Sequence, residues 1–192
     1  MQRIVILGCA GAGKTTLAAG IARRTGLPVV HLDVLFWHPG WTSAPQHEAR
    51  RSLAAALARD RWILDGNFLA AGEEQEDERF DRADAVVFLD RSRSVCFWRV
   101  LKRVLLQGGT RRADLPEGCT ESLDLPLLRW IWRYPRDDRP RVLGLLERLG
   151  GEVSVHRLRS RGDVRRFLRS VGSPGGVAQG ARDPGTRTPS EV

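Results

Sequence analysis

The sequence predicts an α/β protein in which helices cover both faces of a five-stranded parallel sheet. Short apolar segments alternate with longer segments of helical periodicity, which is the layout of repeated strand–helix–strand units. The apolar fraction of 42% and the charged fraction of 28% are typical of a globular domain. At 192 residues, the chain is long enough for one domain with a sizeable core.

The five expected strands are short and apolar, and each is predicted to be buried on both faces of the sheet. They span residues 3–7, 29–32, 62–64, 85–89 and 153–158.

The first two helices have clear boundary signals. Apolar residues recur with helical spacing after Lys14, and Gly26 is well suited to end that helix. Ser43 lies three residues before Gln46, which is the spacing of a capping box, so a second helix is expected to begin there. The predicted inner face of this second helix contains Leu53, Ala54 and Leu57.

Four further helices are expected in the second half of the chain. One spans residues 94–107 and ends at Gly108-Gly109. Two more, at 125–134 and 139–149, are expected to be separated by Pro135, and Asp163 is expected to cap a last helix. From residue 172 onward almost no apolar residue occurs, so residues 1–171 are predicted to form the domain and 172–192 a disordered tail.

One motif carries clear chemistry, the run Gly8-Cys9-Ala10-Gly11-Ala12-Gly13-Lys14-Thr15. It has the pattern G-x-x-x-x-G-K-[ST], directly follows the first strand and opens the first helix. In such a P-loop, backbone N–H groups and the helix N-terminus wrap the phosphates of ATP or GTP. Lys14 is expected to contact the β- and γ-phosphates, Thr15 to ligate Mg²⁺, and Thr16 to complete the nucleotide-binding segment.

Charge and cysteine content bear on the cellular location of the protein but do not identify its binding partner. The net charge is +8, and residues 91–171 carry 19 basic and 9 acidic groups, which suits nucleic acid, a charged nucleotide substrate or solubility alone. No apolar run is long enough to span a bilayer, the N-terminus resembles no signal peptide, and the cysteines form no CxxC pair. A cytoplasmic protein is therefore expected, with no membrane partner and no metal site other than one for Mg²⁺.

Beyond the loop, the sequence resembles the adenylate-kinase-like P-loop kinases, and more closely the small bacterial family labelled DNA topology modulation protein (FlaR-like). The resemblance spans about residues 1–170. It rests on the strings at residues 8–16, 27–33, 36–41, 62–67, 83–90, 98–103 and 129–135, which include Trp62-Ile63-Leu64-Asp65-Gly66-Asn67 and Arg129-Trp130-Ile131-Trp132.

The resemblance implies a sheet like that of nucleoside-monophosphate kinases, with a helical lid over about residues 91–135. Asp65 is similar to the acidic residue that holds a Mg²⁺-bound water beside the loop in those kinases. The arginine that follows in their motif, where it grips an acceptor phosphate, is absent after Asp65-Gly66-Asn67, which argues against a nucleoside-monophosphate acceptor.

Asp33 is expected at the same carboxyl edge of the sheet, the edge where open α/β folds bind ligands. There it would orient an acceptor hydroxyl or a Mg²⁺-bound water. The alternative is a helix cap or a solvated loop residue. Phe36, Trp37 and Trp41 are candidates for the walls of an acceptor pocket, or else for the core.

Candidate cations lie on and after the helix that follows the fourth strand. Arg99, Arg103, Arg111 and Arg112 would stabilise the transferring phosphoryl group, unless they only form a solvated helix face. Arg133 and Arg136 are weaker candidates. Arg161, within Ser160-Arg161-Gly162, is expected in the loop that cradles adenine.

Together these features favour an ATP- and Mg²⁺-dependent kinase of a small-molecule acceptor, either a nucleotide or another metabolite. Lys14, Asp33, Asp65, Arg99 and Arg103 are the expected catalytic residues. Two alternatives remain: a nucleotide-dependent regulator associated with DNA, for which no DNA-binding motif is present, and a plain NTPase switch.

Overall fold

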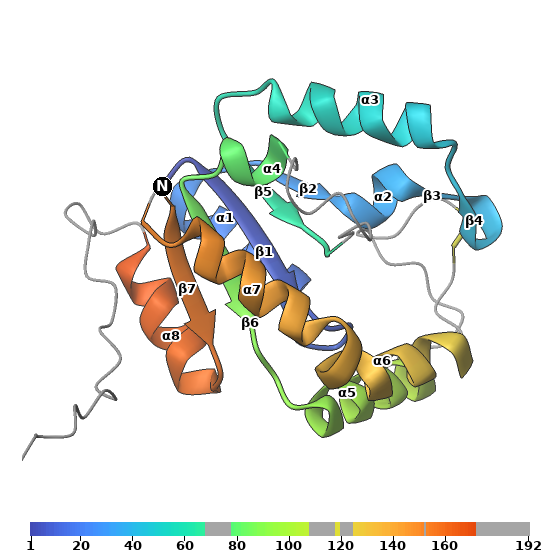
Figure 1. Ribbon diagram of the computed structural model, residues 1–192. Coiled ribbons are helices and arrows are strands. Elements are labelled where there is room, and N and C mark those ends of the chain that lie inside the picture. Colours follow the sequence, from blue (N-terminus) through green and yellow to red (C-terminus); the bar gives the residue numbers. More distant parts are fainter. Residues whose placement is uncertain (68–77, 108–117, 120–124, 152, 172–192) are drawn as a thin grey trace, which may run out of the picture.

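The computed structural model describes residues 1–67, 78–107, 118–119, 125–151 and 153–171 (Figure 1). The predicted tail at 172–192 and the glycines predicted to end the helix at 108–109 lie outside the described residues.

Five parallel strands form the main sheet, and they are the five that the sequence predicts. Their order is β2-β5-β1-β6-β7. Their bounds are β1 (Arg3–Gly8), β2 (Val29–His31), β5 (Trp62–Asp65), β6 (Ala85–Leu89) and β7 (Ser154–Leu158). Because β1 is the central strand, the P-loop that follows it lies at the middle of the carboxyl edge.

Helices cover both faces of this sheet, so the domain has three layers. Ile4 and Ile6 of β1 belong to one apolar core, and Val5 and Leu7 belong to another, because successive side chains of a strand point to opposite faces. The first core includes buried residues of α1 (Lys14–Thr25), α5 (Arg93–Gln107), α6 (Leu125–Asp137) and α8 (Arg161–Ser170). The second includes buried residues of α3 (Gln46–Leu57), α4 (Glu78–Asp81) and α7 (Arg139–Leu149).

The prediction that every strand is buried on both faces is wrong for the two edge strands. All three residues of β2 are half-buried, whereas the residues of β5 are fully buried. Strand β7 begins with an exposed residue and continues half-buried until Leu158. Both strands have only one neighbour in the sheet, so solvent reaches them.

The first helix has the predicted bounds, and the second does not begin as predicted. Helix α1 ends at Gly26, whose φ is 68° and whose N–H bonds to the carbonyl of Ala22. Helix α3 begins after Pro45 without a capping side chain, because Ser43 lies in the short strand β4. In α3, Ala54 is exposed, whereas Ala56 and Leu57 are buried.

Two predictions about helix ends in the second half are also wrong. Pro135 does not separate two helices but lies inside α6, where Ile131 and Tyr134 are buried and hold the helix against the core. Helix α8 is capped by Ser160 rather than by Asp163. The Ser160 side chain accepts from the backbone of Asp163, whose carboxylate accepts in return from the Ser160 backbone, so the two form a capping box.

A small hairpin, which the sequence did not predict, follows β2. Helix α2 (Leu32–Phe36) leads into β3 (Trp37–His38), a 3-10 turn (Pro39–Trp41) and β4 (Thr42–Ser43). In Figure 1 this hairpin lies on the α3 side of the molecule, and α5 and α6 lie beyond the carboxyl ends of β1 and β6. The carboxyl edge of the sheet therefore faces the space between these two groups of elements.

Candidate functional site

The P-loop connects β1 to α1 in a conformation that two of its glycines make possible. Gly11 has φ of 77° and Gly13 has φ of 103°, values that residues with a Cβ rarely adopt. A Cβ on Gly11 would also lie 2.4 Å from the carbonyl oxygen of Cys96 in α5. The glycine is therefore required both by the backbone of the loop and by the close approach of α5.

Helix α5 packs on the loop through buried small and apolar groups. Cys96 is fully buried and Val100 nearly so, and both lie so close to Gly11 that a Cβ there would overlap with them. The thiol of Cys9 hydrogen-bonds to Cys96, and this bond together with burial raises the pKa of Cys9. Cys9 is buried, and its raised pKa keeps the thiol protonated where it packs against α5.

The Lys14 ammonium lies against the loop that it is predicted to serve. Its Nζ donates to the carbonyl of Gly8 at 2.9 Å and to that of Cys9 at 3.4 Å. An ammonium has three donors, so one remains for a ligand. Thr16, also predicted in the nucleotide-binding segment, is exposed in the first turn of α1.

Thr15 and Asp65, the two predicted magnesium residues, are in direct contact. The Thr15 hydroxyl donates to Oδ2 of Asp65 at 2.7 Å, and Asp65 is only 5% exposed. His31 contacts the same oxygen, with Nδ1 at 3.0 Å. The pairing register explains the contact between His31 and Asp65, since Asp65 lies opposite His31 of β2 as well as opposite Ile6 of β1.

Two residues that sequence reasoning did not assign to the site support the start of the loop. Oδ1 of Asn67 accepts a hydrogen bond of 2.8 Å from the Gly8 N–H. Arg79, which is 2% exposed, donates to the carbonyl of Asn67 at 3.1 Å. The position of Asn67, two residues after Asp65, could have indicated its role in the site. No local sequence pattern indicates a role for Arg79.

Of the predicted cations, Arg99 reaches the loop. Its Nη1 donates to the carbonyls of Gly11 and Ala12 at 3.3 and 3.1 Å. Arg103 lies one turn further along α5 and is half-buried. Arg133 instead forms an exposed ion pair with Asp137 in its own helix. Of the other candidates, Arg136 is exposed on α6, and Arg111 and Arg112 lie outside the described residues.

Arg91 adds a cation that the sequence analysis missed. Burial, followed by the repulsion of Arg99 and with a further contribution from Arg161, lowers the pKa of Arg91. Its Nη1 donates to the carbonyl of Arg159 at 2.8 Å. Arg161, the predicted adenine-loop residue, is exposed at the first position of α8. Arg99 and Arg161 thus lie close enough to Arg91 for their charges to repel it, while Asp163 partly offsets this repulsion.

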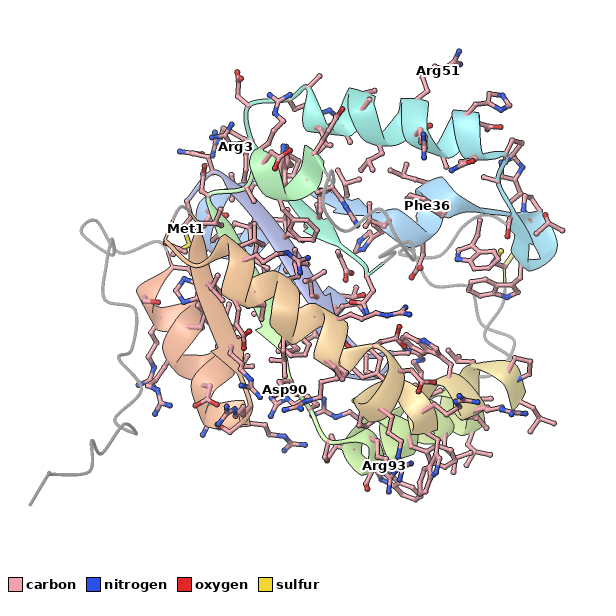
Figure 2. The ribbon with its side chains drawn as sticks, viewed as in Figure 1. Met1, Arg3, Phe36, Arg51, Asp90 and Arg93 are labelled. Carbon is pink, nitrogen blue, oxygen red and sulfur yellow. The ribbon has the colours of Figure 1, made fainter. Side chains whose placement is uncertain are left out.

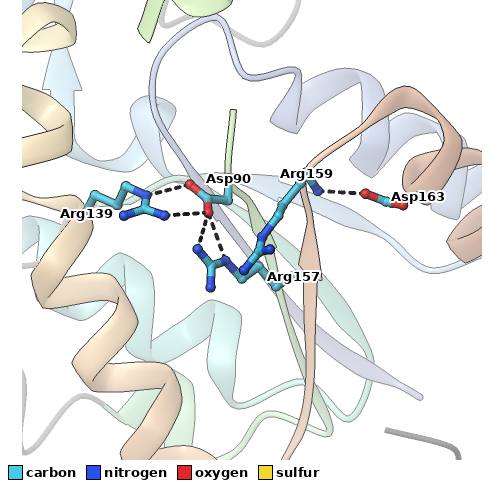
Figure 3. Close-up of polar contacts among 5 residues, drawn as sticks. All are labelled: Asp90, Arg139, Arg157, Arg159 and Asp163. Atoms are coloured by element: carbon cyan, nitrogen blue, oxygen red, sulfur yellow. Dashed lines mark hydrogen bonds and ion pairs between the residues drawn. The ribbon is translucent and has the colours of Figure 1, made fainter. Parts of the chain in front are cut away.

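The residue before Arg91, Asp90, binds two further arginines. Asp90 directly follows β6 and accepts two hydrogen bonds each from Arg139 of α7 and Arg157 of β7 (Figure 3). Burial alone would raise the pKa of Asp90, but the bonds from these guanidinium groups hold it below its ordinary value. The carboxyl ends of β6 and β7 are therefore tied to the start of α7.

The predicted acceptor side is less closely defined. Asp33 is half-buried at the second position of α2. Phe36 packs against the core, whereas Trp37 and Trp41 meet edge to face with ring centroids 6.0 Å apart and Trp41 is 40% exposed. The two tryptophans therefore belong to the surface hairpin, and the roles predicted for Asp33 and the aromatic residues stay predictions.

The described residues contain neither a candidate metal-binding cluster nor a membrane-spanning helix. No group of three or more His, Cys, Asp and Glu in that part of the chain is placed to hold a metal ion. None of its helices combines the length and the apolar character needed to cross a membrane.

The sequence matches no protein-family model and no curated protein. Solved structures do match. A gluconokinase from Sinorhizobium meliloti 1021 has a TM-score of 0.50 and 21% sequence identity, over 88% of this chain and 87% of its own. A putative kinase from Chloroflexus aurantiacus j-10-fl has a TM-score of 0.52 and 16% identity, over 88% of this chain and 96% of its own.

At these identities the likeness is one of fold. The chain has the three-layer α/β fold of a P-loop NTPase, with a five-stranded parallel sheet, and shares that fold with the two kinases. None of the comparisons reaches the smaller family that the sequence resembles, so that assignment stays a prediction, as does the role of residues 91–135 as a lid.

Proposed function

We propose that the chain is a kinase that transfers the γ-phosphoryl group of MgATP to a small-molecule acceptor. The proposal rests on the convergence at one loop of the Lys14 ammonium, the Arg99 guanidinium and the Thr15–Asp65 pair. A phosphoryl group in transfer carries negative charge, which enzymes stabilise with cations and positioned donors. The description of both structural neighbours as kinases agrees with this reading.

The residues of the loop fit a magnesium-bound triphosphate. The positive φ values of Gly11 and Gly13 shape the turn that leads into the N-terminus of α1, where an anion is favoured. The Thr15 hydroxyl uses its proton on Asp65, so its oxygen lone pairs remain for a cation. The P-loop segment Gly8–Thr15 contains no carboxylate, and Arg99 of α5 donates to two of its carbonyls.

The residues of the site then have defined tasks in the reaction. Thr15 and, through a water molecule, Asp65 would hold Mg²⁺, which would neutralise negative charge on the phosphates. The loop N–H groups and Lys14 bind and orient the phosphates. The Arg99 guanidinium provides a positive charge beside the loop, and Arg103 lies one turn further along the same face of α5.

We place the acceptor at the carboxyl edge between β2 and β5, beside α2. Asp33 would orient the acceptor hydroxyl there. Asn67 follows Asp65-Gly66, and the next arginine in the chain, Arg79, is buried and donates to the Asn67 carbonyl, so we favour an acceptor that carries no phosphate group.

The test is acceptor-dependent ADP formation from labelled ATP with a panel of sugars, sugar acids, other metabolites and nucleotides. Lys14→Ala should lower the rate by about 100-fold or more. Arg51→Ala is the control, because Arg51 is exposed and extends into solvent from α3 (Figure 2). ADP formation that no acceptor stimulates would instead identify an NTPase switch. Lys14→Ala with wild-type activity would refute the proposal altogether.

A further inference from the structure

His31 is the last residue of β2 and stands directly opposite Asp65 in the sheet. Register partners on neighbouring strands point to the same face, so the contact between their side chains follows from the pairing of β2 with β5. The His31 side chain is 23% exposed and that of Asp65 is 5% exposed. The histidine therefore lies between solvent and the buried carboxylate.

The hydrogen bonds around Asp65 are unevenly shared between its two oxygens. Oδ2 receives the Thr15 hydroxyl at 2.7 Å and faces His31 Nδ1 at 3.0 Å. A carboxylate oxygen only accepts, so the proton of the imidazole lies on Nδ1. Among the residues that the structure describes, none donates a hydrogen bond to Oδ1. Two donors thus fix one oxygen and leave the other for a ligand.

We propose that His31 is a positioning residue for magnesium. By donating to Oδ2, it holds the Asp65 carboxylate so that Oδ1 accepts a hydrogen bond from a metal-bound water, while Thr15 gives its oxygen to the metal. The inference rests on the proposed function, because the metal enters with ATP. Removing an outer-shell partner of this kind typically costs about 10–100-fold in metal affinity.

A purely structural role for His31 makes a different prediction. Strand β2 has only three residues, and a side chain that merely held this edge strand would affect stability without changing the need for metal. Two variants separate these roles. His31→Asn keeps an N–H donor at the same distance from Cβ as Nδ1, whereas His31→Leu keeps bulk without a donor.

The experiment is a calorimetric titration of ATP at a series of Mg²⁺ concentrations, with EDTA as the metal-free point. For His31→Leu we expect the half-saturating Mg²⁺ concentration to rise about tenfold or more, with ATP affinity in EDTA unchanged. His31→Asn should stay close to the wild type. Circular dichroism checks that both variants fold.

Several outcomes would overturn the inference. One is a His31→Leu variant with wild-type Mg²⁺ dependence, which would leave the proposed function intact. Another is a His31→Asn variant as impaired as His31→Leu. Nitrogen-15 NMR of the metal-free wild type gives a third check that needs no variant, because an unprotonated Nδ1 would remove the donor. Wild-type protein that binds no ATP at all would instead refute the proposed function, and this inference with it.

Discussion

Replacing Asp90 with asparagine removes the charge that holds two arginines at the carboxyl ends of β6 and β7. The carboxylate is 7% exposed and accepts from Arg139 and Arg157 at distances between 2.6 and 3.0 Å. An asparagine has the same shape but turns an N–H₂ group toward one guanidinium. The variant therefore loses hydrogen bonds and leaves two cations without their partner.

The expected cost follows from burial. Breaking a buried ion pair costs about 3–5 kcal/mol, and exposed pairs contribute about 0–1 kcal/mol. Asp90 is buried, but the side chains of Arg139 and Arg157 are 35% and 30% exposed, so water recovers part of the loss. We expect about 2–3 kcal/mol, which for a domain of this size lowers Tm by about 5–10 °C.

Thermal unfolding followed by circular dichroism measures this change. The matched control is Asp137→Asn, which breaks the ion pair with Arg133 in which both side chains are about half exposed, and which should cost at most about 0.5 kcal/mol. If the two variants lower Tm equally, the clamp at Asp90 does not stabilise the fold as argued.

The pH dependence gives a second check on the same residue. The pKa of Asp90 is lowered in the folded protein from its ordinary 3.8, so its contribution is fully present above that value and is lost as the pH falls through the folded-state pKa. The difference between wild type and Asp90→Asn should persist from neutral pH down to about pH 4 and shrink only below it. A difference that disappears already between pH 7 and pH 5 would contradict the assignment.

Other substitutions test the loop and its neighbours. Gly11→Ala forces a Cβ onto the backbone of α5, so it should cost more stability than the roughly 1–2 kcal/mol of left-handed strain alone and should abolish ATP binding. Gly26→Ala is the matched control: its Cβ would meet nothing within 4 Å, so it should cost about 1 kcal/mol and leave ATP binding unchanged. Similar ATP affinities in the two variants would count against the packing argument. Ser160→Ala should lower stability by about 1 kcal/mol in thermal unfolding, and no change would mean that the capping box is not stabilising. Arg99→Met removes donors to two loop carbonyls, so calorimetry should show ATP affinity reduced by about tenfold; an unchanged value would separate Arg99 from nucleotide binding.

The sequence predicted the fold because its signals are local and repeated. Five apolar strands with helices between them permit few arrangements, and the P-loop motif fixes which strand is followed by the phosphate cradle. The helix ends that were predicted wrongly show where tertiary contacts override local sequence preferences. The capping spacing at Ser43 was overridden when that residue paired in a hairpin, and Pro135 was accommodated in a helix held by buried neighbours.

The partners of the buried carboxylate could not be predicted in the same way. The contact between Thr15 and Asp65 follows from two motifs that the sequence marks. The contact between His31 and Asp65 depends on the register of β2 against β5, which no local pattern encodes. Sequence reasoning therefore placed Asp33, two residues further on, at the edge where the structure places His31.

The variable positions of the P-loop motif are explained by packing rather than by phosphate chemistry. Cys9 and Ala12 are each 2% exposed, and the loop between them touches Cys96 and Val100 of α5. The same helix carries Arg99, whose guanidinium bonds to the carbonyls of Gly11 and Ala12. A side chain at Gly11 would push α5 outward and move the cation away from the loop. The shape of the phosphate cradle and the position of its neighbouring arginine are thus set by one contact, which explains why small residues occupy positions that the motif itself leaves open.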